Sequence, residues 1–163
     1  MSKSSVPLWI LIGLPGSGKS TWATSFCAGR SPLQLISTDQ IRGELFGDQA
    51  IQGPWPLIWK QVDRCFHQAV IAIQAGTYGG AVYDATNAQR RGRRTVIEAA
   101  HGAGFTHILA IWFDVSTAQC LARNQQRSRQ VPLEVIERMA RQLSGAPPHV
   151  DEGFDAVYRL YVG

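Results

Sequence analysis

An apolar run that leads into a glycine-rich loop restricts the folds open to this chain. Leu8–Ile12 is continuously apolar, as in a strand buried on both faces. Residues 13–20 then read Gly-Leu-Pro-Gly-Ser-Gly-Lys-Ser, and residues 21–28 continue in a pattern that favours a helix. A strand, a glycine loop and a helix in this order point successive backbone N–H groups at one anion, and the helix N-terminus adds favourable partial charge. The segment therefore predicts a phosphate-binding loop.

The side chains of this loop predict a nucleoside triphosphate, ATP, bound with Mg²⁺. Lys19 is expected to reach the β- and γ-phosphates, and the Ser20 hydroxyl to coordinate Mg²⁺. The alternative is a glycine-rich turn without a ligand. The predicted nucleotide-binding residues are Gly13, Pro15, Gly16, Ser17, Gly18, Lys19, Ser20 and Thr21.

Length and composition predict one ordinary folded domain over residues 1–163. The chain is 45% hydrophobic and 17% charged, which leaves little room for disorder. Cys27, Cys65 and Cys120 are far apart and lack the spacing of a zinc site, so we expect reduced thiols and a cytoplasmic protein. The first apolar run is too short for a signal peptide or a membrane span, and no membrane partner is expected. The net charge of +4, mostly from arginine, indicates several phosphates in the ligand set or reflects composition alone.

Strand and helix patterns alternate along the chain. Further β-rich apolar runs cover residues 33–36, 80–83, 108–115 and 156–162, and helical patterns separate them. This alternation is typical of an α/β domain with a parallel sheet.

Several helix boundaries have sequence signals. Apolar residues at three-four spacing from Trp55 to Ile73 predict an amphipathic helix that ends at Gly76. Its pattern predicts Trp59 in the core, and Trp55 either there or beside an acceptor cleft. Thr86-x-x-Gln89 and Ser116-x-x-Gln119 predict capping boxes, and Pro132 predicts the start of a helix over residues 133–143.

Two residues after the second predicted strand are candidates for acceptor chemistry. Carboxyl ends of parallel strands line the ligand crevice, so Asp39 is expected near the triphosphate, where it can accept the proton of an attacking hydroxyl. Arg42 lies three residues on, on the same helix face, and is expected to pair with an anionic group of the acceptor. The alternative makes Asp39 the N-cap of a helix over residues 40–46 and Arg42 a solvated charge.

The third predicted strand ends near Asp84, which has two interpretations. Its carboxylate can hold a water on Mg²⁺, as strand-end aspartates do in phosphoryl-transfer sites. Alternatively it ties down the turn, while Thr86 or Asn87 caps the next helix; capping is the interpretation favoured for these two residues.

Two groups of arginines follow. Arg90, Arg91, Arg93 and Arg94 crowd a predicted helix start, where the dipole disfavours them, which indicates a polyanionic partner or only a solvated face. Arg123 and Arg127, four apart on one helix face, form a basic strip with Arg129. The strip predicts a lid over roughly residues 121–133 that brings catalytic arginines to the transferred phosphoryl group; an ordinary amphipathic helix is the alternative.

The assembled motifs resemble a known family. They are Gly-Leu-Pro-Gly-Ser-Gly-Lys-Ser-Thr, Ser-Thr-Asp-Gln-Ile-Arg, Asp-Ala-Thr-Asn and Arg-Asn-Gln-Gln-Arg-(x)3-Val-Pro. Their order and spacing resemble the 5′-kinase domain of phage and bacterial polynucleotide kinases, P-loop phosphotransferases that also include zeta toxins. The resemblance covers roughly residues 8–162. It implies an adenylate-kinase-like five-stranded parallel sheet, order 2-3-1-4-5, with helices on both faces and a small helical lid.

The same resemblance implies ATP-dependent transfer of the γ-phosphate to a 5′-hydroxyl of RNA or DNA. Lys19 and Ser20 would act on phosphate and Mg²⁺, and Asp39 would be the general base. Arg42 would contact the phosphate 3′ of the attacking nucleoside, and Arg123 and Arg127 would be the lid arginines. The chain lacks the Asp-x-Asp-Gly-Thr motif of the 3′-phosphatase found in some relatives. The alternatives are a small-molecule or zeta-toxin-like sugar-nucleotide kinase and a non-enzymatic ATP-binding module.

Overall fold

One parallel sheet of five strands organises the molecule. The structure, a computed structural model, describes residues 4–29 and 32–161. The strands are β1 (Pro7–Ile12), β2 (Leu33–Ser37), β3 (Gly80–Asp84), β4 (His107–Asp114) and β5 (Ala156–Tyr161). They pair in the order β2-β3-β1-β4-β5, and every pair is parallel. This confirms the predicted fold class and strand order. The last predicted run extended to residue 162, which lies outside the described residues.

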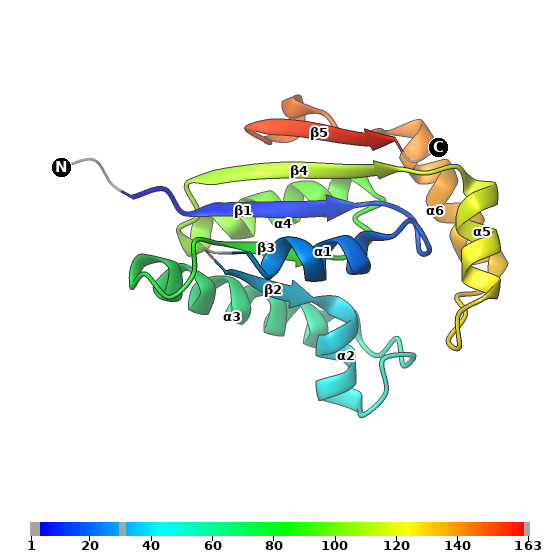
Figure 1. The fold of residues 1–163 in the computed structure, drawn as a ribbon, viewed down its shortest axis with the longest axis horizontal. Helices are drawn as coiled ribbons and strands as arrows, with labels where there is room; N and C mark the ends of the chain where they lie inside the picture. The colour runs from blue at the N-terminus through cyan, green and yellow to red at the C-terminus, as the bar shows by residue number, and fades with distance from the viewer. Residues whose placement is uncertain (1–3, 30–31, 162–163) are drawn as a thin grey trace.

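Six α-helices connect and cover the strands. They are α1 (Lys19–Cys27), α2 (Thr38–Phe46), α3 (Trp55–Gln74), α4 (Arg90–Ala103), α5 (Thr117–Gln125) and α6 (Leu133–Gly145), and a 3₁₀ turn spans Val150–Glu152. Figure 1 shows α1 on one face of the sheet, α3 and α4 on the other, and α5 and α6 near the carboxyl ends of β4 and β5. Because all strands run parallel, these ends meet at one edge, where α2 also begins.

The central strands are buried on both faces, which explains their unbroken apolar sequences. Leu8, Ile10, Leu11 and Ile12 of β1 are fully buried. The predicted amphipathic helix is confirmed as α3, whose Phe66 packs edge-on against Tyr83 of β3 and against Phe105.

Three of the helix caps considered from the sequence differ from the structure in whole or in part. Ser37, not Asp39, caps α2, because the Ser37 hydroxyl accepts the N–H of Gln40. The box from Thr86 to Gln89 is wrong: α4 begins at Arg90, and its N-cap residue Gln89 makes no side-chain cap.

The third difference is partial. Ser116 does cap α5 by accepting the N–H of Gln119, whereas the Gln119 Oε1 is buried without a partner in the described part of the chain. The start of α6 after Pro132 is as predicted.

Candidate active site

The glycine loop between β1 and α1 adopts a conformation that only glycine accepts readily at two positions. Gly16 and Gly18 have φ angles of 84° and 94°, in the left-handed region. A Cβ on Gly16 would lie 2.6 Å from the Cys120 carbonyl oxygen, so the loop packs directly against α5. The N–H of Gly13 donates to the Thr86 carbonyl at 3.0 Å, which ties the loop to the segment after β3. The loop is therefore held from both sides.

Most of the predicted nucleotide-binding residues line one cleft at the carboxyl edge of the sheet. The cleft has a volume of about 1040 Å³. The loop residues that line it are Pro15, Gly16, Gly18, Lys19, Ser20 and Thr21. Gly13 and Ser17 are buried behind this wall.

Lys19 and Ser20 sit where the loop becomes α1. Lys19 is buried, and its Nζ donates to the Leu14 carbonyl of the same loop at 3.0 Å. Burial lowers the pKa of Lys19, and the nearby Asp84 carboxylate opposes this shift. The Ser20 hydroxyl donates to Asp84 Oδ2 at 2.8 Å. A phosphate would give the buried ammonium a partner of opposite charge in this position.

Ser20 and Asp84 are also the pair that fits Mg²⁺. Magnesium takes few protein oxygens and keeps several waters when it is bound with phosphates. The two oxygens face each other from the start of α1 and the end of β3. No group of three or more His, Cys, Asp or Glu side chains that could hold a metal occurs among residues 4–29 and 32–161.

The sequence suggested that Thr86 or Asn87 caps α4. Neither residue does so; both instead fasten the segment after β3 to neighbouring backbone. Asn87 has a φ of 49°, and its amide donates to the Leu11 carbonyl at 2.7 Å. The Thr86 carbonyl accepts from Gly13, and the helix begins only at Arg90 with Gln89 in the N-cap position. The Asp84 side chain is bonded to Ser20.

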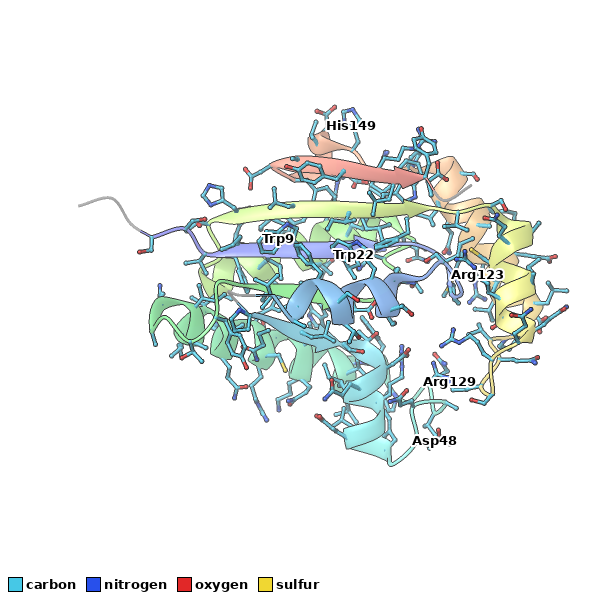
Figure 2. The ribbon with its side chains drawn as sticks, in the orientation of Figure 1. Trp9, Trp22, Asp48, Arg123, Arg129 and His149 are labelled. Atoms are coloured by element: carbon cyan, nitrogen blue, oxygen red, sulfur yellow. The ribbon has the colours of Figure 1, made fainter. Side chains whose placement is uncertain are left out.

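Asp39 lies in the first turn of α2, between two arginines. Its Oδ1 accepts from Arg42 Nη1 at 3.1 Å, and its Oδ2 accepts from Arg129 Nη2 at 3.2 Å. Asp39, Arg42 and Arg129 all line the cleft. Figure 2 shows Arg129 extending from the segment after α5 toward α2. The Arg42 contact follows from helical spacing, whereas no sequence signal linked Arg129 to Asp39.

The segment predicted as a lid, roughly residues 121–133, comprises the second half of α5 and the loop over residues 126–132. Arg123 Nη1 donates to the Gly16 carbonyl at 3.3 Å, so α5 contacts the glycine loop (Figure 2). The prediction that Arg127 shares the helix with Arg123 is wrong, because α5 ends at Gln125. Arg127 nevertheless lines the cleft, and its charge contributes to the lowered pKa of Lys19.

One buried amide fixes the lid loop. Asn124 Oδ1 accepts from the Val131 N–H at 2.9 Å, and Asn124 Nδ2 donates to the Val131 carbonyl at 2.8 Å. Asn124 is 5% exposed. These two bonds close the loop that carries Arg127 and Arg129.

Aromatic and α6 side chains complete the cleft. Trp55 and Trp59 line it, with ring centroids 6.3 Å apart and near-parallel planes. Trp59 also packs on the core as predicted, whereas Trp55 is exposed. Another wall comes from α6, which was not predicted to be part of the site. Four residues that share one face of this helix line the cleft: Val135, Arg138, Met139 and Gln142.

Neither interpretation of the α4 arginine cluster holds for the whole cluster. Arg93 is fully buried and donates from Nε to Glu152 Oε2 at 3.0 Å and from Nη2 to the Ala146 carbonyl at 2.7 Å. Arg90 Nε also donates to Glu152, at 3.0 Å. These two arginines are bound to the protein itself. Arg91 lines the cleft, and Arg94 is exposed outside it.

Comparison with known proteins places the chain in a family. The sequence pattern of the family described as an AAA domain matches residues 8–146. The chain belongs to this family. No curated protein matches it. The resemblance to the polynucleotide kinase-like P-loop phosphotransferases is confirmed at the level of family and fold.

Solved structures share the fold. A chain in a structure of the Pnkp1/Rnl/Hen1 RNA repair complex has a TM-score of 0.72 and 24% identity, covering 94% of this chain and 48% of that one. A second structure of the Pnkp1/Rnl/Hen1 complex gives 0.62 and 26%, with coverage of 82% and 42%. A gluconokinase from Sinorhizobium meliloti 1021 gives 0.55 and 15%, with 99% and 85%. This chain thus spans less than half the length of the first two matches. The fold that it shares with them is a kinase-like P-loop fold.

Within the described residues, every helix is too short or too polar to cross a bilayer.

Proposed function

We propose that this protein is an ATP-dependent kinase that transfers the γ-phosphate to a 5′-hydroxyl end of RNA or DNA. One observation carries the proposal: Asp39 lines the same cleft as the glycine loop, and arginines of two elements surround it. A nucleotide switch has no need of a carboxylate in this position, whereas phosphoryl transfer to an alcohol uses one.

The loop residues would hold the donor. Backbone N–H groups of residues 13–20 and the Lys19 ammonium would bind the β- and γ-phosphates, and Ser20 and Asp84 would hold Mg²⁺, Asp84 directly or through a water. Magnesium, when bound, neutralises charge on the phosphates. Arg123 and Arg127 from the lid would stabilise the charge that develops on the transferred phosphoryl group.

Asp39 would act on the acceptor. Its carboxylate accepts the proton of the attacking 5′-hydroxyl while the hydroxyl oxygen forms a bond to the γ-phosphorus. The bond between the γ-phosphorus and the oxygen shared with the β-phosphate breaks, and ADP leaves. Arg42, fixed three residues away, would bind the phosphate on the 3′ side of the reacting nucleoside. We also propose a cytoplasmic location, because the three separated cysteines suggest reduced thiols.

The test is transfer of labelled γ-phosphate from ATP to RNA and DNA oligonucleotides with a free 5′-hydroxyl. The native protein should label them, and Asp39→Asn should lower the rate by about 10²–10⁴-fold, the usual contribution of a general base, with ATP affinity retained. Asp63→Asn, a half-buried carboxylate of α3 outside the cleft, is the matched control and should leave the rate unchanged.

Other results would redirect the proposal. Labelling of a nucleoside, a UDP-amino sugar or an antibiotic, with none on oligonucleotides, would identify a small-molecule kinase. Tight Mg-ATP binding without transfer to any acceptor would identify a non-enzymatic ATP-binding module.

A further inference from the structure

Both carboxylate oxygens of Asp39 are occupied in this structure. Arg42 takes Oδ1 and Arg129 takes Oδ2. A general base needs an oxygen within hydrogen-bond reach of the proton that it removes, roughly 2.6–3.2 Å between heavy atoms. Each oxygen can accept more than one hydrogen bond, so the acceptor hydroxyl reaches Asp39 either at a second position of one oxygen or in place of one arginine.

Arg129 is the partner that can leave. Arg42 is part of the same helix as Asp39, three residues on, and its side chain is 16% exposed. Arg129 comes from the lid loop, 90 residues away in sequence, and its side chain is 30% exposed. Arg129 is thus the more exposed of the two and belongs to a separate segment, which Asn124 holds in shape, so its side chain can rotate away while α2 keeps its place.

Each arginine also has a buried donor without a partner. Within residues 4–29 and 32–161, Arg42 Nε and Arg129 Nη1 make no hydrogen bond although neither is accessible to solvent. A buried charged donor without an acceptor is unfavourable, so these atoms favour an additional oxygen-rich anion. One carboxylate between two guanidinium groups leaves one positive charge uncompensated. Phosphate, with several acceptor oxygens, matches two guanidinium groups.

We propose that Arg129 is a binding residue for the acceptor phosphate and that binding of this phosphate releases Asp39. This inference rests on the proposed function. In the free protein Arg129 holds Asp39 through Nη2. When an acceptor with a phosphate next to its reacting nucleoside enters, Arg129 and Arg42 bind that phosphate together, and Oδ2 of Asp39 becomes free for the hydroxyl. An acceptor without this phosphate has to displace Arg129 without replacing its anionic partner, so the two arginines select phosphate-bearing acceptors.

A binding experiment tests the inference without any transfer step. Calorimetry with Mg²⁺ and a non-hydrolysable ATP analogue compares adenosine with adenosine 3′-phosphate. The native protein should bind the phosphate-bearing ligand at least about 10-fold more tightly, as a charge-assisted hydrogen bond allows. Arg129→Ala should reduce this ratio about 10-fold, mainly by weakening the binding of adenosine 3′-phosphate; adenosine should bind no more weakly than to the native protein, because it no longer competes with Arg129 for Asp39. Arg129→Lys should restore it in part, because lysine supplies the charge without the planar fork.

The control is Arg141→Ala, which removes the same charge from an exposed position of α6 outside the cleft and should keep the native ratio. In the transfer assay Arg129→Ala should raise KM for the oligonucleotide and leave KM for ATP and kcat within a few-fold. An Arg129→Ala variant that keeps the native ratio, or a native protein without preference for the phosphate, overturns the inference. Failure to label oligonucleotides would instead overturn the proposed function, since the binding ratio is measured without catalysis.

Discussion

Arginine side chains of this molecule serve different purposes that their charge alone does not distinguish. Arg93 is fully buried on Glu152 and backbone carbonyls, and Arg123 contacts the glycine loop through the Gly16 carbonyl. Arg42 and Arg129 share the carboxylate of Asp39. Most arginines that line the cleft therefore come from α2, the lid segment and α6; of the four at the start of α4, where the sequence is richest in arginine, only Arg91 lines it.

At the same scale, the contact between Ser20 and Asp84 gives a prediction about magnesium. Asp84→Asn keeps the shape of the side chain but removes its charge beside the Ser20 hydroxyl. We expect the Mg²⁺ concentration for half-maximal rate to rise about 10–100-fold, the range for loss of a ligand-supporting side chain. Kinetic titration of Mg²⁺ at saturating ATP measures it.

Asp63→Asn is again the control, because Asp63 lies on α3 away from the cleft. An unchanged magnesium requirement in Asp84→Asn would remove Asp84 from the metal site.

Local patterns predicted individual residues well where the contact is local. The glycine loop is continuous in sequence, and Asp39 and Arg42 are three residues apart on one helix. Arg93 was misjudged because its partner, Glu152, is 59 residues away. Arg129 was noted only as part of a basic strip, since no pattern connects it with Asp39 across 90 residues.

Among the elements, the lid depends on a single side chain. Asn124, near the end of α5, bonds both backbone groups of Val131 and closes the loop that carries Arg127 and Arg129. The loop lies between α5 and α6 and contacts α2 through Arg129. Its shape therefore determines where two of the cleft arginines are held.

We expect Asn124→Ala to loosen this loop while the sheet stays folded. The change removes two hydrogen bonds and leaves the Val131 backbone groups without their partners, at a cost of about 1–3 kcal/mol in protein stability. Trypsin should then cleave after Arg127 or Arg129 several-fold faster than in the native protein, because cleavage follows local opening.

Gel analysis of a proteolysis time course measures the effect. Gln125→Ala is the matched control, since the exposed Gln125 contributes only its backbone carbonyl to the loop. Equal cleavage rates in all three proteins would show that Asn124 does not hold the loop.

Elements were predicted where their pattern is periodic and misplaced where a boundary depends on distant atoms. The five strands and α3 lie within a residue or two of the predicted ranges. For β1 and β3, burial on both faces demands continuous apolar runs, and for α3 the apolar residues recur at three-four spacing. The predicted start of α4 was wrong, because the helix begins at Arg90 after Gln89; the Thr86 carbonyl and the Asn87 amide instead contact Gly13 and Leu11, which no local signal reveals.

Across the whole molecule, a chain of buried polar contacts links the segment before β5 to the glycine loop. Glu152 binds Arg93, and Arg93 Nη1 donates to the Asn87 and Ala88 carbonyls at 3.1 Å. Asn87 in turn donates to Leu11 at the end of β1. Although Glu152 is outside the cleft, it supports the backbone that positions the loop.

This chain of contacts makes stability depend on pH through Glu152. Burial raises the pKa of Glu152, but the hydrogen bonds and charge of Arg93, with Arg90 and the His149 N–H, outweigh burial and lower it. A carboxyl whose pKa is lower in the folded than in the unfolded protein stabilises the fold above the unfolded pKa, near 4.3 for glutamate. That contribution is lost as pH falls from there through the folded pKa.

We therefore expect Glu152→Gln to lower the free energy of unfolding by about 3 kcal/mol at pH 7, because Arg93 stays buried without its counter-charge. The difference from the native protein should shrink as pH falls below about 4.3, since Glu152 of the unfolded native chain then binds a proton that the folded ion pair resists. Urea unfolding at pH 7, 5 and 3.5 measures it. Glu137→Gln, an exposed change on α6, should shift stability by no more than about 0.5 kcal/mol at each pH. A difference that stays constant or grows toward acid pH would mean that Glu152 is not held as an ion pair, and the link from Arg93 to the glycine loop would lose its support.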